Sequence, residues 1–123
     1  MNILELLDNH PKAAIVIKQW FLARMLESLN TDSLPEEFKE YVRQQGIDNN
    51  KIADMVESNP RTLFTPFDLQ KVYVKIDIKI QSEKDATFGW SINNDPISQW
   101  YSDRISAEKD AIKEAFKILN NKL

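Results

Sequence analysis

KVYVKIDIKIQ, residues 71–81, alternates between two classes of side chain with almost no exception. Valine or isoleucine occupies every even position from 72 to 80, while the odd positions hold Lys, Asp, Tyr and Gln. Successive side chains of a β-strand point to opposite faces of the sheet. The stretch therefore predicts an antiparallel strand with its aliphatic face on a core and its charged face in water.

Residues 86–92 repeat the alternation and predict a second strand, joined to the first by a turn at 82–85. Matching the two apolar faces places Ile78 opposite Phe88 and Ile76 opposite Trp90. Gly89 then lies on the charged outer face, where we expect Tyr73 to cover it.

The segment from 93 to 105 is predicted as a loop or as a loop with a short third strand. A last helix, capped by Ser106, carries a continuous apolar face that includes Phe116. An isolated hairpin is only marginally stable in water, so we expect this helix to cover it. Phe116 should be a core residue of that contact.

Residues 1–60 read as about four amphipathic helices. We expect the first at 1–9 and the second, with Pro11 in its first turn, running to about residue 30. The third begins at a Ser33–Glu36 capping box and stops at Gly46, and Asp48 caps the fourth, which ends before Asn59. Residues 61–68, between Pro60 and Pro66, are predicted to be irregular.

The expected fold class is therefore α+β: N-terminal helices, then an antiparallel β-hairpin covered by a C-terminal helix. A chain of 123 residues is the usual size of one domain. We expect a single domain, 1–123, with a helical part at 1–60 and a hairpin-plus-helix part at 69–123.

Composition narrows the classes of function. The chain has no cysteine and a single histidine, His10, which excludes disulfides, thiolate metal sites and multi-histidine cages. We expect a cytoplasmic protein without a secretory leader and without a membrane-spanning helix. Twelve lysines against four arginines suggest an AT-rich genome, bacterial or phage, and hence a phage- or mobile-element-derived protein.

Gly46-Ile47, Lys51-Ile52-Ala53 and Ser58-Asn59-Pro60-Arg61-Thr62-Leu63 resemble a bacterial helix-turn-helix. The resemblance covers about twenty residues and implies a DNA-reading helix beginning at Arg61. Pro66 would fall inside that helix and break it, so we favour a structural helix followed by an irregular crossover.

The strand–strand–helix order of the C-terminal half resembles the latter half of a double-stranded-RNA-binding domain. That resemblance implies lysines at the start of the last helix that contact phosphates. In Ser106-Ala107-Glu108-Lys109-Asp110-Ala111 only Lys109 matches, and Glu108 and Asp110 would repel a phosphate backbone. We therefore interpret Lys109, Lys113 and Lys117 as a solvated helix face.

Catalytic, cofactor and metal motifs are lacking. The chain has two glycines and hence no glycine-rich phosphate loop, and its carboxylates and serines show no recognised spacing. We expect no enzyme, no cofactor and no metal.

The candidate contact surface is the outer hairpin face with the following loop. It comprises Tyr73, Lys75, Lys79, Trp100, Tyr101 and Arg104. The alternative for Trp100 and Tyr101 is that they cap the open end of the sheet. We expect a small interaction or regulatory protein that binds an unidentified protein partner or itself, as a homodimer. The alternative function is RNA or DNA binding by the same basic and aromatic face, which the net charge of −3 disfavours.

Overall fold

The computed structural model describes residues 2–28, 35–37, 40, 44 and 46–123, and every structural statement below concerns those residues. Their elements, in chain order, are α1 (Ile3–Asn9), α2 (Pro11–Ser28), α4 (Asn49–Val56), the 3₁₀ helix η1 (Pro60–Leu63), α5 (Phe64–Leu69), β1 (Val74–Ile80), β2 (Ala86–Ile92) and α6 (Arg104–Lys122). The predicted α+β order, helices then hairpin then helix, is confirmed. Most of the predicted third helix lies outside the described residues.

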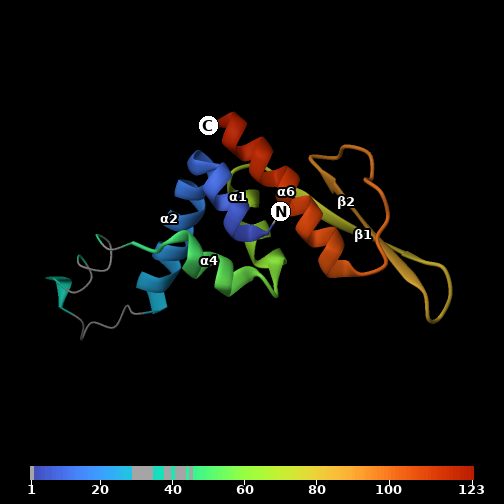
Figure 1. The fold of residues 1–123 in the computed structure, drawn as a ribbon, viewed down its shortest axis with the longest axis horizontal. Helices are drawn as coiled ribbons and strands as arrows, with labels where there is room; N and C mark the ends of the chain where they lie inside the picture. Colours follow the sequence, from blue (N-terminus) through green and yellow to red (C-terminus); the bar gives the residue numbers. More distant parts are fainter. Residues whose placement is uncertain (1, 29–34, 38–39, 41–43, 45) are drawn as a thin grey trace.

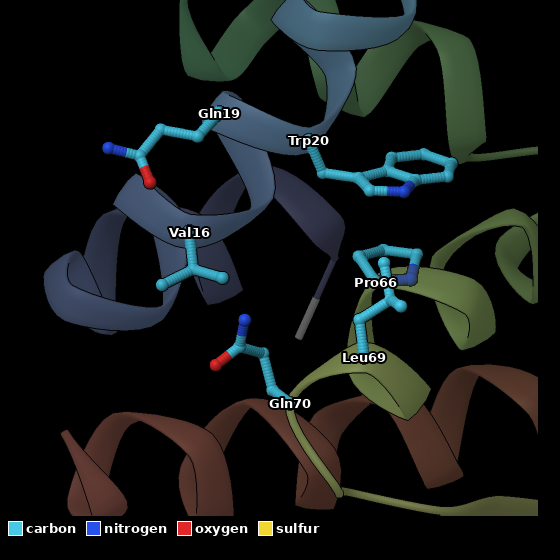
Figure 2. Close-up of a pocket in the computed structure, with 6 residues that line it drawn as sticks. All are labelled: Val16, Gln19, Trp20, Pro66, Leu69 and Gln70. Carbon is cyan, nitrogen blue, oxygen red and sulfur yellow. The ribbon is translucent and has the colours of Figure 1, made fainter.

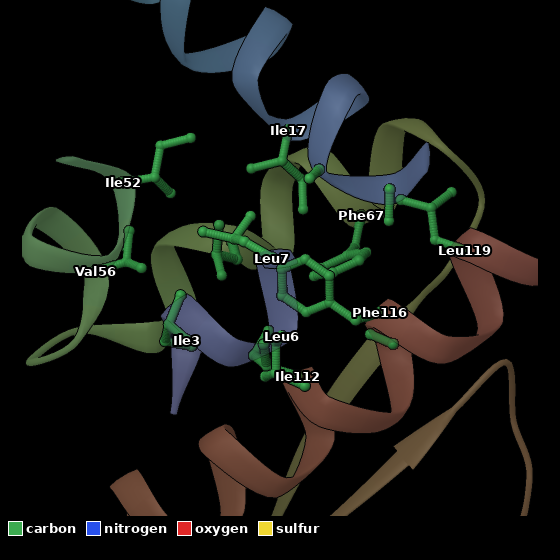
Figure 3. Packing of buried hydrophobic residues seen from close by; sticks show 14 of the residues in the cluster. Ile3, Leu6, Leu7, Ile17, Ile52, Val56, Phe67, Ile112, Phe116 and Leu119 are labelled. Carbon is green, nitrogen blue, oxygen red and sulfur yellow. The ribbon is translucent and has the colours of Figure 1, made fainter. Parts of the chain in front are cut away.

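The helices enclose one apolar core. Its largest members come from α1, α2, α4, η1, α5, β2 and α6: Ile3, Leu6, Leu7, Ile17, Ile52, Val56, Leu63, Phe67, Ile92, Ile112, Phe116 and Leu119 (Figure 3). The rings of Phe67 and Phe116 meet edge to face, with their centroids 5.3 Å apart. α6 lies between the hairpin and the N-terminal helices and contacts both (Figure 1).

Local side-chain caps account for the starts of α1, α4 and α6. Asn2 caps α1 by accepting from the Glu5 N–H at 2.8 Å, and the predicted cap of α4, Asp48, accepts from Lys51 at 2.8 Å. Gly46 has φ +67°, the left-handed conformation predicted for it. The start of α2 is different, because its free Lys12 and Ala13 amides donate to Oδ1 of Asn120, near the end of α6.

The prediction of an irregular segment at 61–68 was wrong. Pro60 opens η1, and Pro66 is the third residue of α5. The first turn of a helix has no internal acceptor for its N–H groups, so a proline there breaks nothing. The residues that resemble a DNA-reading helix thus form a 3₁₀ turn and a six-residue helix that buries Pro66 and Phe67.

β1 and β2 pair antiparallel in the predicted register, with Ile78 opposite Phe88 and Ile76 opposite Trp90. α6 covers the inner part of the hairpin, and Phe116 is fully buried. The predicted cap of α6 was wrong: Asp103 caps it, and the Ser106 N–H and hydroxyl both donate to Asp103 at 2.8 Å. The backbone and side-chain hydrogen bonds from Ser106 lower the pKa of Asp103.

The aliphatic face predicted for the first strand is fully buried only at Val72, which precedes β1, and is half-buried at Val74 and Ile76, which corrects the sequence prediction. Val72 is fully buried, whereas Ile78 is 51% exposed and Ile80 is 76% exposed. The outer end of the hairpin projects away from the helices, so the described helices do not cover Ile78 and Ile80 (Figure 1).

Of the segment predicted as a loop at 93–105, residues 93–103 form a loop with one antiparallel bridge to β2, and residues 104 and 105 already belong to α6. The Phe88 N–H donates to Tyr101 O at 2.8 Å, and the Tyr101 N–H donates to Phe88 O at 2.7 Å. The short third strand, one of two predicted alternatives, is reduced to this bridge. Among the described helices none is long and apolar enough to cross a lipid bilayer.

Candidate functional site

The hairpin face opposite α6 holds the most distinctive exposed residues. It carries the odd-numbered residues of β1 and β2, and Ile97 and Trp100 lie over it. We call this surface the tryptophan face. Gly89 makes this arrangement possible because it has no side chain. A Cβ built on Gly89 would lie 2.6 Å from Cγ2 of Ile97 and 3.2 Å from Cε3 of Trp100. The prediction that Tyr73 covers Gly89 was therefore wrong.

Trp100 is packed on one side and open on the other. Its side chain lies over Gly89, and 43% of the residue is exposed. The Lys79 ammonium lies 5.9 Å from the centroid of the indole ring, within the range of a cation–π contact. The surface thus presents an aromatic ring that is packed on one side and lies beside a positive charge.

Two polar atoms on the same side of the hairpin lack partners. Oδ2 of Asp77 and Oγ1 of Thr87 are enclosed, and neither has a hydrogen bond to any part of the described chain. The other carboxylate oxygen of Asp77 lies 3.4 Å from Nζ of Lys75, whose side chain is 70% exposed. Enclosed polar groups in folded proteins are normally paired, so Asp77 is a point where an added donor would stabilise the molecule.

Tyr101 lies on the opposite face, toward α6. Oδ2 of Asp110 accepts from the Tyr101 hydroxyl at 2.5 Å and from Nε1 of Trp90 at 2.8 Å. Nε2 of Gln99 donates to the same hydroxyl at 2.9 Å. Burial and the hydrogen bond to Asp110 raise the pKa of Tyr101. These bonds attach the hairpin and the following loop to α6, which is a structural role.

Arg104 and Tyr73 contact other residues of the chain. Nε of Arg104 contacts Oε1 of Glu108 at 3.1 Å, and Glu108 is only 2% exposed, so Arg104 neutralises a buried carboxylate. Tyr73 is 53% exposed at the inner end of the hairpin, where its backbone exchanges hydrogen bonds with Asn93. The structure thus brings together Lys75, Lys79 and Trp100 from the predicted surface.

Sequence reasoning missed Ile97 and the exposure of Ile78 and Ile80. The signal for Ile97 was Gly89, because a glycine inside a strand often marks a close approach by another part of the chain. No local signal distinguishes the exposed Ile78 from the buried Val72, since both obey the same alternation.

An open hollow lies between α2 and α5. It has a volume of about 250 Å³ and is lined by Val16, Gln19, Trp20, Pro66, Leu69 and Gln70 (Figure 2). The Arg24 guanidinium lies 4.9 Å from the Trp20 ring centroid. Two amides and an apolar floor can hold an uncharged side chain, but the lining has no group that titrates near neutral pH.

A second hollow, about 290 Å³, is lined by Tyr101, Ser106, Lys109, Asp110 and Lys113. One of its two lysines already forms an ion pair, since Nζ of Lys109 contacts Oε1 of Glu57 at 3.1 Å.

His10 lies between α1 and α2, with Nδ1 at 2.7 Å from Leu6 O. Within the described ranges, no three His, Asp or Glu side chains gather around a common metal position.

Comparisons of the chain with protein-family models, with curated proteins and with solved structures gave no match.

Proposed function

We propose that the protein is a non-enzymatic interaction module that binds another protein through the projecting hairpin. The contact surface is the tryptophan face, and Ile78 and Ile80 extend the exposed apolar area on the other face of the hairpin, at the outer end of β1. The observation that carries the proposal is Trp100, which is held in place by Gly89 and Ile97 while 43% of it stays exposed.

Physical reasons favour this surface as a binding site. Interfaces concentrate their binding energy in a few large residues, with tryptophan among the most enriched. A ring that is already fixed loses little side-chain entropy when a partner covers it. Ile78 and Ile80 add exposed aliphatic area at 51% and 76%, on an element that projects from the helices. A partner can therefore reach these residues without displacing the core.

The proposal is tested by comparing what the intact protein and its Trp100→Ala variant bind. Proteins captured by the wild type are identified, purified and titrated against both forms by calorimetry. We expect Trp100→Ala to weaken binding at least tenfold, which matches the loss of one interface anchor of about 2 kcal/mol. Ile15→Ala is the matched control, because Ile15 is 56% exposed on α2, far from the hairpin in sequence. Equal affinities of the wild type and Trp100→Ala would reject the tryptophan face as the contact surface.

Nucleic-acid binding is the second candidate, and one observation favours it. Lys79 lies against Trp100, and Lys75 is exposed on the same face, so a base could stack on the ring while lysines meet phosphates. Asp77 stands between the two lysines and opposes such contacts. Affinity for single-stranded RNA or DNA that falls steeply with salt and is lost in Trp100→Ala would support this candidate. No change in Trp fluorescence on titration at low salt would reject it.

A further inference from the structure

The outer edge of β1 carries backbone groups without partners. In an antiparallel pair, two opposite residues direct their N–H and C=O groups either toward each other or both away. Phe88 exchanges both of its bonds with Tyr101, and Trp90 O accepts from the Ser98 N–H at 2.9 Å. Phe88 and Trp90 therefore direct these groups away from β1, and their opposite residues, Ile78 and Ile76, direct theirs away from β2.

The same parity holds along the strand, so Ile80 also directs its N–H and C=O outward. No described residue bonds to the outward groups of Ile76, Ile78 or Ile80. An unpaired edge of this kind is a template for another strand. Exposed isoleucines at 78 and 80 make this edge apolar as well as unpaired.

We propose that the occupant of this edge is the β1 edge of a second copy of the chain, paired antiparallel around a two-fold axis at Ile78. This inference goes beyond the proposed function, because it concerns the backbone edge of β1 and not the tryptophan face. In this register Ile78 faces Ile78 of the second copy, and Ile76 faces Ile80. About six backbone hydrogen bonds form, two for each such pair.

Charge complementarity selects this register over its neighbour. With the axis at Ile78, Asp77 of each copy lies opposite Lys79 of the other, and both pairs are attractive. With the axis one residue earlier, Asp77 would face Asp77 and Lys75 would face Lys79, and all of these contacts repel. Moving the axis to Ile76 also pairs opposite charges, but it leaves the exposed Ile80 opposite the fully buried Val72.

Pairing also brings a cation to the Asp77 carboxylate, whose Oδ2 has no partner within a single copy of the described chain. In a single copy, Oδ1 of Asp77 lies 3.4 Å from Lys75 and Oδ2 has no partner in the described chain. Lys79 of the second copy would supply a second cation to this carboxylate. The isoleucines meet on one face of the joined sheet and the charges on the other, so both faces fit at once.

The first experiment exchanges the charges and measures the dimer dissociation constant by analytical ultracentrifugation. Asp77→Lys places two lysines opposite each other in each pair, and Lys79→Asp places two aspartates, so each variant alone should dimerise at least about tenfold more weakly. An equimolar mixture of the two variants should dimerise as well as the wild type, because every pair is then attractive. Lys84→Asp is the matched control for Lys79→Asp, because it makes the same change of charge in the turn. We expect it to dimerise with the affinity of the wild type. Circular dichroism checks that each variant is folded.

The second experiment uses the absence of cysteine from the chain. Ile78→Cys places two thiols on the two-fold axis, where paired Cα atoms are about 5.5 Å apart and a disulfide can form. Ile80→Cys is more exposed, but its thiols would be roughly 14 Å apart along the strands. We expect fast oxidative cross-linking for Ile78→Cys and slow cross-linking for Ile80→Cys. Random collisions would give the reverse order, because Ile80 is the more exposed residue.

A wild type that stays monomeric up to millimolar concentration overturns this inference, as does a variant mixture that fails to recover. Neither result tests the proposed function, which is decided by comparing the partner affinities of the wild type and Trp100→Ala. Conversely, a charge-dependent dimer with no change in partner binding by Trp100→Ala retains the edge pairing and rejects the tryptophan face.

Discussion

Gly89 is the residue on which the tryptophan face depends. An added methyl group would lie 2.6 Å from Ile97 and 3.2 Å from Trp100, so the loop must move outward. We predict that Gly89→Ala lowers the free energy of unfolding by about 1–3 kcal/mol, the usual range for overpacking. Chemical denaturation measures the loss, and the fluorescence of Trp100 should shift as the ring is displaced.

Thr87→Ala serves as the matched control on the same strand and face. The Thr87 hydroxyl is enclosed without a partner in the described chain, so its removal leaves no donor or acceptor unpaired. We expect little change or a small gain in stability. A Gly89→Ala variant as stable as Thr87→Ala would show that the loop does not depend on close contact at position 89.

The Tyr101 hydroxyl gives a prediction for the pH dependence of stability. Burial and the bond to Asp110 raise its pKa in the folded protein, so the unfolded chain loses this proton first as pH rises. The stabilisation is complete below about pH 10 and is lost as pH rises through the folded-state pKa. Unfolding free energies measured from pH 8 to 11 should fall less steeply for Tyr101→Phe than for the wild type. Parallel slopes would contradict the assignment.

Among the elements, α6 holds the two halves of the chain together. Phe116 is fully buried, with its ring 5.3 Å from that of Phe67 and 5.9 Å from that of His10. Phe116→Ala should lower the free energy of unfolding by about 3–5 kcal/mol, because a large buried ring leaves a cavity. Thermal or urea unfolding measures this. Ile80→Ala, at a position 76% exposed, should change stability by less than about 0.5 kcal/mol.

At the scale of the whole molecule, local stability should differ between the helical core and the projecting hairpin. The outward amides of Ile78 and Ile80 have no acceptor in the described chain, whereas Ile112 and Phe116 lie in the middle of α6. We predict fast hydrogen exchange at 78 and 80 in dilute solution and slow exchange at 112 and 116, measured by NMR. Edge pairing adds protection at 78 and 80 as concentration rises. Slow exchange at these two positions in dilute solution would contradict the free edge.

How much of this could be read from the sequence follows from the range of each interaction. Alternation over 71–81 and 86–92 was sufficient for both strands and for their register, because side-chain parity is a property of the strand itself. Asp48 marked the start of α4 through a hydrogen bond to an amide three residues on, and Gly46 adopts the left-handed conformation predicted for it. The Pro60–Pro66 segment was misjudged because proline both breaks helices and begins them, and position within the first turn decides which.

The sequence predicted some residues of the candidate site but not their placement on the two faces of the hairpin. Lys75, Lys79 and Trp100 were identified, but Trp100 and Tyr101, adjacent in sequence, diverge to opposite faces of the hairpin. The cap of α2 comes from Asn120, more than a hundred residues away, which no local pattern signals.

Both strands, the hairpin register and the start of α4 were thus decided by the order of amino acids alone, because side-chain parity and the Asp48 cap are properties of the local chain. Which isoleucines stay exposed, which face receives Trp100 and which strand edge stays unpaired were decided only when distant elements packed. These properties depend on how far α6 reaches along the hairpin and on which hairpin face the loop after β2 covers. The alternation of apolar and polar residues along a strand encodes neither.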